Sequence, residues 1–163
     1  GSVMFVVNFK TPENWLAQSG IDFNSREQVL AWFKKEFAGW SDRWYEFFTN
    51  DEVYFIPRPQ YYFPFNQTWE TQANLTMLGD AAHRMPPYAG EGANVALQDA
   101  FELAENLTGN IFPDIRTAIA QFEKEMIERG ANATKDTLEN SEKMFSNNAL
   151  EQMSAFFNQV KEA

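Results

Sequence analysis

The sequence predicts an α/β fold, arranged in this chain as α+β, with part of a β-sheet followed by a C-terminal helical region. Three observations predict it. Residues 3–9 (VMFVVNF) are β-branched and aromatic with little alternation, which is typical of a strand covered on both faces. Residues 75–78 (LTML) form a second, short buried-strand candidate that runs directly into Gly79 and Asp80. From residue 92 onward, apolar residues recur at helical spacing.

Composition limits the classes of function. The chain has 163 residues, and 13 Lys and Arg against 23 Asp and Glu give a net charge of −10, which disfavours binding to nucleic acid or anionic membranes. There is no cysteine and only one histidine, so disulfides, thiol catalysis and clustered Cys or His metal sites are excluded. The first apolar run is too short to span a membrane or to serve as a secretory signal. We therefore expect a soluble, cytoplasmic protein with no metal and with neutral or cationic partners.

The first 74 residues mix helix and strand signals. Gly1 and Ser2 resemble a cloning scar, which would make the chain a piece of something longer. Ser25 to Gln28 has the form of a capping box that opens a helix, and Ser41 is placed to cap a second, short helix. Residues 53–65 are β-like, but their prolines restrict them to short or edge strands.

Residues 75–109 carry the chemistry. They read as a strand, a Gly-Asp pair, a turn with two prolines and two glycines, and a helix that ends before Gly109. Glycines let a ligand approach the backbone closely, and the free amides of Gly92, Ala93 and Asn94 at the helix start form a partial positive pole. Asp80, at the carboxyl end of a strand, suits the hydroxyl groups of a sugar. We expect an electron-rich or anionic group at this turn.

Residues 110–163 are predicted to be C-terminal helices. Asp114 follows Pro113 at the start of a long helix that extends to about residue 145, and Gly130 could interrupt or kink it. A last amphipathic helix spans about residues 149–161. Two alternatives stay open at this point: Asp99 is either a solvated charge or a buried partner, and His83 is either structural or functional.

The turn resembles the second flavin-binding motif of the class A FAD-dependent aromatic monooxygenases, which have the para-hydroxybenzoate hydroxylase fold. The resemblance is carried by Gly79-Asp80-Ala81-Ala82-His83, Pro86-Pro87, Gly90-Glu91-Gly92-Ala93-Asn94 and Asp99-Ala100. Residues 12–16, 24–29 and 123–126 are most similar to the tetracycline-inactivating members. The similarity covers nearly the whole chain and corresponds to the C-terminal half of such an enzyme.

The resemblance implies a function and a set of site residues. FAD would be reduced by NADPH, and a flavin C4a-hydroperoxide would hydroxylate a bulky aromatic or tetracycline-like, polycyclic substrate. The implied cofactor-binding residues are Asp80, Pro87, Gly90, Glu91, Gly92, Ala93 and Asn94. The implied substrate-side residues are His83, Tyr88 and Met144. No individual catalytic residue is assigned, because the flavin carries the oxygen chemistry.

The resemblance also implies a domain division and a missing part. Residues 3–74 would belong to the substrate-binding domain, residues 75–109 to the flavin motif and residues 110–163 to the C-terminal helices. Val95 stands where a third glycine of a dinucleotide fingerprint would be, so the N-terminal Rossmann-type half is lacking. We therefore expect the chain alone to bind FAD weakly or not at all and to be inactive.

Two alternatives remain. The chain could be a truncated, non-catalytic interaction module that keeps the fold and self-associates through exposed sheet edges. The second alternative is a related flavoprotein chemistry on the same fold, either epoxidation or Baeyer–Villiger oxidation.

Overall fold

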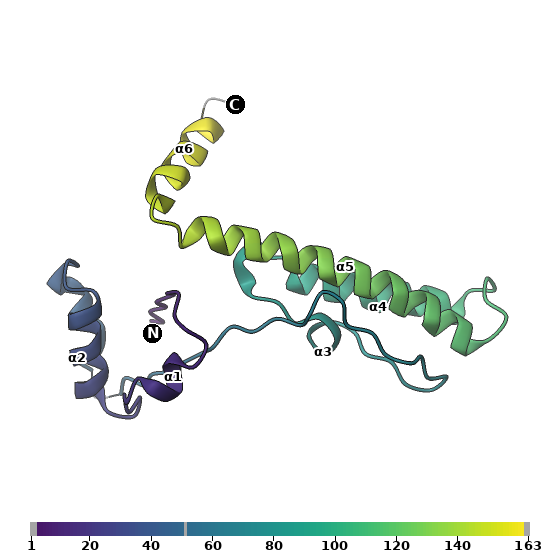
Figure 1. The fold of residues 1–163 in the computed structure, drawn as a ribbon, viewed down its shortest axis with the longest axis horizontal. Helices are drawn as coiled ribbons and strands as arrows, with labels where there is room; N and C mark the ends of the chain where they lie inside the picture. The colour runs from purple at the N-terminus through teal and green to yellow at the C-terminus, as the bar shows by residue number, and fades with distance from the viewer. Residues whose placement is uncertain (1–2, 51, 162–163) are drawn as a thin grey trace. The chain divides into compact units, whose positions relative to one another are not determined.

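The computed structural model describes residues 3–50 and 52–161, so the proposed cloning scar at Gly1 and Ser2 lies outside the described residues. The chain divides into two compact units, Gly1–Pro59 (unit 1) and Gln60–Ala163 (unit 2), and each is described by itself. Within the described ranges, regular structure consists of α-helices and short 3-10 helices (Figure 1).

The predicted β-sheet is wrong, and with it the α/β class. No strand forms in the described part of the chain, and residues 3–9, 53–65 and 75–78 contain neither a strand nor a helix. A β-strand is stabilised by hydrogen bonds from a paired strand, and β propensity largely reflects packing against such neighbours. Only part of the apolar pattern in these segments reflects burial: Phe5 and Val7 pack against the core of unit 1, whereas Met4, Tyr54 and Leu75 are exposed.

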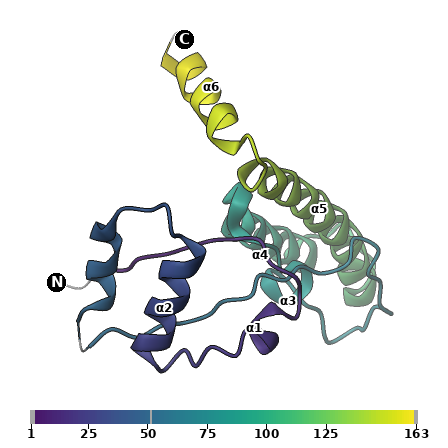
Figure 2. The same ribbon diagram turned by 60° about the vertical axis from the view of Figure 1, so that its left-hand side comes forward.

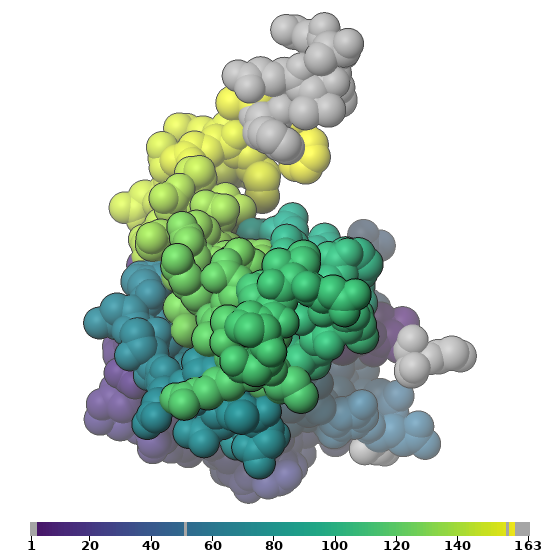
Figure 3. All heavy atoms as spheres, turned by 90° about the vertical axis from the view of Figure 1, so that its right-hand side faces the viewer, coloured from purple at the N-terminus to yellow at the C-terminus, as the bar shows by residue number. Residues whose placement is uncertain are grey.

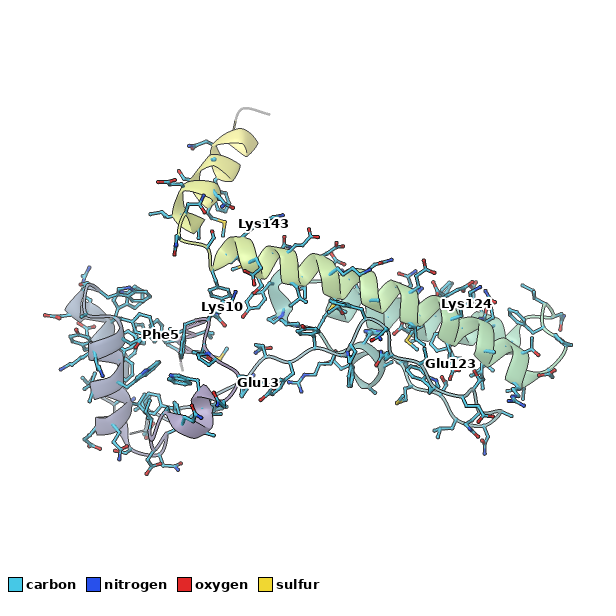
Figure 4. All side chains as sticks on the ribbon, viewed as in Figure 1. Phe5, Lys10, Glu13, Glu123, Lys124 and Lys143 are labelled. Carbon is cyan, nitrogen blue, oxygen red and sulfur yellow. The ribbon has the colours of Figure 1, made fainter. Side chains whose placement is uncertain are left out.

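Unit 1 is built around an aromatic core. It contains helices α1 (Trp15–Gln18) and α2 (Arg26–Glu36) and the 3-10 helix η1 (Asp42–Phe48). Val29, Phe33 and Phe48 form its buried centre. Phe5, labelled in Figure 4, stacks on the rings of Trp44 and Phe47 with centroid distances of 5.2 and 4.7 Å.

The predicted helix starts in unit 1 are confirmed. Ser25 is the N-cap of α2, and its hydroxyl accepts the amide of Gln28 at 3.3 Å. Ser41 is the N-cap of η1, and its hydroxyl accepts the amide of Arg43 at 3.4 Å. The side chain of Gln28 accepts the amide of Asp22 at 3.0 Å, so it ties the preceding loop to the helix.

Unit 2 is a helical layer that carries the turn of interest. It contains α3 (Asp80–His83), η2 (Pro87–Ala89), α4 (Gly92–Thr108), α5 (Ile115–Met144) and α6 (Ala149–Lys161). Helices α4 and α5 lie side by side, and α6 extends away from the end of α5 (Figures 1 and 2). The connection from α4 to α5 lies foremost in Figure 3, which views the molecule from the end where α5 begins.

Helix α5 runs without a break past Gly130, so the expected interruption there does not occur. Asp114 caps its start, because its carboxylate accepts the amide of Thr117 at 2.8 Å. Its apolar stripe supplies Phe122 and Met126, which are fully buried with Ala82 of α3 in the core of unit 2. No helix in the described ranges combines the length and the apolar character needed to cross a membrane.

A buried carboxylate ties an irregular segment to α5. Glu123 is 4% exposed, and its two oxygens accept the hydroxyls of Thr71 at 2.5 Å and Thr76 at 2.8 Å. Glu123 and its exposed neighbour Lys124 are both labelled on α5 in Figure 4. Residues 71–76 therefore keep a fixed position on α5 without forming a strand.

The different burial of two phenylalanines in unit 2 predicts that their alanine substitutions lower the free energy of unfolding by different amounts. Phe122 is fully buried, whereas Phe101 on α4 is 64% exposed. Phe122→Ala should lower the free energy of unfolding by about 3–5 kcal/mol, because it opens a cavity. Phe101→Ala should change it by no more than about 0.5 kcal/mol. Urea titrations followed by circular dichroism measure both, and an equal loss for the two variants would show that another surface covers Phe101 in solution.

The α5 cap predicts a pH dependence. Hydrogen bonds from Thr117 hold the pKa of Asp114 below its ordinary value. A lowered pKa in the folded state stabilises the protein above the ordinary pKa of about 3.9, and this contribution is lost as the pH falls through the lowered value. The stability advantage of the natural chain over Asp114→Asn, which caps but does not titrate, should therefore shrink towards pH 3. Urea unfolding at several pH values tests this, and an advantage that grows on acidification would contradict it.

Candidate functional site

An open groove of about 650 Å³ lies where α3, the η2 turn and the start of α4 meet. Its lining residues are Leu78, Gly79, Asp80, Met85, Pro86, Pro87, Gly90, Gly92, Ala93 and Ala96. The structure thus brings together most of the residues that the sequence assigns to a cofactor. Glu91 and Asn94 lie on the same turn but outside this lining, with the Asn94 amide 3.5 Å from a Glu91 oxygen.

Glycines shape this groove in two ways. Gly79 and Gly90 have φ values of 57° and 70°, a region of backbone conformation that favours glycine. A Cβ on Gly79 would also lie 3.1 Å from the Cβ of Ala96, so α4 approaches this residue closely. At Gly90 and Gly92, an added Cβ would meet nothing within 4 Å in the described part of the chain. Those two glycines leave open space beside the groove.

Two polar features of opposite charge lie at the groove: the start of α4 and the carboxylate of Asp80. Helix α4 begins at Gly92, and no side chain among the described residues caps its first turn. The first amides of a helix lack partners within the helix and carry a partial positive charge that attracts anions. Asp80 lines the groove with an exposed carboxylate, which accepts hydrogen bonds only. One ligand with a hydroxyl-bearing part and an electron-rich part would satisfy both features.

A buried ionic network lies behind this turn. Asp99 of α4 is fully buried, so the alternative of a solvated charge is excluded. One of its oxygens accepts the Gly79 amide at 2.9 Å and lies 2.5 Å from Nε2 of His83. Its other oxygen accepts Nη2 of Arg129 at 2.9 Å. Arg129 in turn lies 2.7 Å from a carboxylate oxygen of Glu102.

The predicted substrate-side residues occupy two places. His83 is 3% exposed and belongs to the ionic network instead of the groove lining. The ring of Tyr88 meets Phe145 edge to face at 5.4 Å, and burial raises the pKa of its hydroxyl. Met144 is the last residue of α5, next to Phe145, and is 43% exposed. Tyr88 and Met144 therefore lie near the same end of α5, and their contact with a substrate stays a prediction.

The side chains of α5 that hold the η2 turn and its surroundings were not predicted from the sequence. Thr137 of α5 is fully buried, and its hydroxyl donates to the Pro86 carbonyl at 2.8 Å and accepts the Ala89 amide at 2.9 Å. Arg129 and Glu123 also act from α5. A signal for Thr137 was present, because Gly130, Thr134 and Thr137 continue the helical spacing of the apolar residues of α5, although they are not apolar themselves.

Residues 67–112 match the family described as FAD binding domain. This segment contains the whole groove lining. The chain is also 35% identical over 94 residues to FAD-dependent monooxygenase phnB of Penicillium herquei, which covers 56% of this chain and 23% of that protein.

Two other relatives extend the comparison. Kynurenine 3-monooxygenase of Xanthomonas campestris pv. campestris is 36% identical over 74 residues, which is 45% of this chain and 16% of that enzyme. The chloroplastic zeaxanthin epoxidase of an Oncidium hybrid cultivar is 30% identical over 118 residues, 66% of this chain and 17% of that protein. The chain thus spans less than a quarter of the length of these relatives. The matches show similarity to an FAD binding domain and to proteins named as monooxygenases or an epoxidase, over part of this chain.

The contact between α3 and α5 predicts whether Gly130→Ala raises or lowers the stability of unit 2. Alanine is a better helix former than glycine by about 1 kcal/mol, so propensity alone favours Gly130→Ala. A Cβ on Gly130 would, however, lie 2.5 Å from Cβ and 2.7 Å from Cγ of His83. These atoms are close to the backbone and cannot swing away, so the substitution should destabilise unit 2 by about 1–3 kcal/mol.

The control for Gly130→Ala is Asn132→Ala, at an exposed position of the same helix. Helix propensity should make this control neutral or slightly stabilising. Urea unfolding of both variants decides the question. A more stable Gly130→Ala protein would mean that His83 does not pack against α5 as described.

Proposed function

We propose that this chain is the C-terminal portion of an FAD-dependent, NAD(P)H-using monooxygenase. The observation that carries the proposal is the groove at Gly79, Asp80, Gly90 and Gly92, which lies within the segment that matches an FAD binding domain. The monooxygenase names of the relatives support the reaction class.

The groove fits part of a flavin on structural grounds. The residues around it are mainly Pro, Ala, Leu, Met and Gly, which suits a flat apolar ring, and Gly90 and Gly92 leave space that any side chain would fill. The uncapped start of α4 suits the electron-rich edge of such a ring. The Asp80 carboxylate suits the hydroxyls of a ribityl chain.

Each of these residues would bind or orient the cofactor. Asp80 would accept hydrogen bonds from flavin hydroxyls, and Pro87, Gly90 and Gly92 would pack their backbone against the cofactor. The amides of Ala93 and Asn94 would stabilise negative charge on the flavin. When bound, the flavin supplies the activation of oxygen, so this chain contributes positioning and electrostatics.

The substrate class is a finer part of the proposal. A bulky aromatic or tetracycline-like substrate would lie towards Tyr88 and Met144, whose aromatic and thioether side chains suit a polycyclic surface. His83 would act behind the turn through Asp99. The sequence resemblance supports this substrate class, and mass spectrometry of substrate and product would separate hydroxylation from epoxidation or Baeyer–Villiger oxidation.

Absorption spectra test the proposal. The chain alone, with FAD added, should show weak or no binding and no turnover, because a dinucleotide fingerprint is missing. A version extended upstream into a dinucleotide-binding half should retain bound flavin after gel filtration. In that version, Asp80→Asn should weaken FAD binding about ten- to a hundredfold through the loss of charge-assisted hydrogen bonds.

Asp136→Asn, an exposed position of α5 outside the groove lining, is the matched control and should leave FAD binding unchanged. Absence of flavin from both the chain and the extended version would refute the proposal. Equal losses in the two variants would show that Asp80 has no specific contact with the cofactor.

A second candidate function is a non-catalytic interaction module. The predicted sheet edges cannot serve it, since the described residues form no sheet. The exposed apolar side chains of Leu97 and Phe101 on α4, at 71% and 64% exposure, favour it instead. Light scattering of the chain alone distinguishes the two: a stable dimer favours the module, and a monomer favours the flavoprotein portion.

A further inference from the structure

We propose that Asp99 is a positioning residue that sets the conformation of the Gly79–Asp80 turn and thereby the place of the Asp80 carboxylate at the groove. The effect on FAD rests on the proposed function, whereas the effect on the turn rests on the geometry of this chain alone.

Asp99 holds both ends of α3. Gly79 is the N-cap of this helix and His83 is its last residue, and both bind the same oxygen of Asp99. Helix α3 has 4 residues, too few to be stable by itself, so its position depends on external contacts. Asp80 is its first residue. The direction of the Asp80 side chain therefore depends on Asp99 through the Gly79 amide.

The network fixes which nitrogen of His83 carries a proton. A carboxylate only accepts hydrogen bonds, so Nε2 must donate to Asp99. Nδ1 is buried and has no partner among the described residues, which suits an unprotonated nitrogen better than an N–H donor. The charged groups linked to His83 in this network are Asp99, Arg129 and, beyond Arg129, Glu102.

Only a carboxylate satisfies this arrangement. Asp99 receives three donors: the Gly79 amide, Nε2 of His83 and the Arg129 guanidinium. Asparagine has the same shape but offers one accepting oxygen and one NH₂ group, so in either orientation a donor would face another donor. Because the site is buried, water cannot compensate for this mismatch. Asp99→Asn should therefore release the turn while altering little volume.

Nuclear magnetic resonance on the tag-free 163-residue chain tests the proposal directly. His83 is the only histidine, so its imidazole signals need no assignment. In the natural chain, the proton should reside on Nε2, and the Gly79 amide should exchange slowly with solvent. In Asp99→Asn, exchange at Gly79 should accelerate at least about tenfold, while amides in the middle of α5 keep their protection.

Glu102→Gln is the matched control, because Glu102 contacts Arg129 without contacting the turn. It should leave exchange at Gly79 within about twofold of the natural chain. Arg129→Lys, which keeps the charge, should give exchange between that of the control and that of Asp99→Asn. If Asp99→Asn does not fold, the proton position in the natural chain and the Arg129→Lys result still decide. A proton on Nδ1 alone, or an unchanged Gly79 exchange rate in Asp99→Asn, would overturn the proposal.

The functional consequence is measured in the flavin-retaining extended protein. Asp99→Asn should weaken FAD binding about tenfold with unchanged far-ultraviolet circular dichroism, and Glu102→Gln should not. Accelerated exchange at Gly79 together with unchanged FAD affinity would overturn the positioning role. If no version binds FAD, the proposed function fails, and the exchange and imidazole data still decide whether Asp99 holds the turn.

Discussion

Buried polar contacts from one face of α5 hold the irregular parts of unit 2 in register. Glu123 binds two threonine hydroxyls of the segment before α3, Arg129 binds Asp99, and Thr137 binds the carbonyl and amide at the two ends of the η2 turn. A buried polar group without a partner costs about 1–3 kcal/mol, so each turn has one favourable position along α5. The groove inherits its shape from these contacts, because its own residues are mostly small and lie in short elements.

The family match covers only some of the residues that build the folded site. The match covers residues 67–112 and ends before α5 begins at Ile115. The groove lining lies within the match, but Arg129 and Thr137, which hold that lining, lie outside it. In physical terms the site therefore extends beyond the match to α5, which holds the groove lining without being part of it.

Local signals in the sequence predicted the local structure well. Ser25 and Asp114 are helix caps because their side-chain oxygens accept hydrogen bonds from backbone amides three residues further along the chain, and no distant residue is needed for that. The predicted strands failed for the opposite reason: an apolar run is a local pattern, but a strand also needs a partner elsewhere in the chain. The role of Asp99 was undecidable for the same reason, because its partners lie 16, 20 and 30 residues away. Only the folded arrangement brings these groups together.

The close approach of Gly130 to His83 gives the chain an internal chemical reporter. The only imidazole of the sequence lies between α3 and α5 and is 3% exposed. A reagent that acylates imidazole, such as diethyl pyrocarbonate, can reach it only when these two helices separate. The rate of its modification therefore measures how often α3 and α5 separate behind the groove, with no label introduced into the protein.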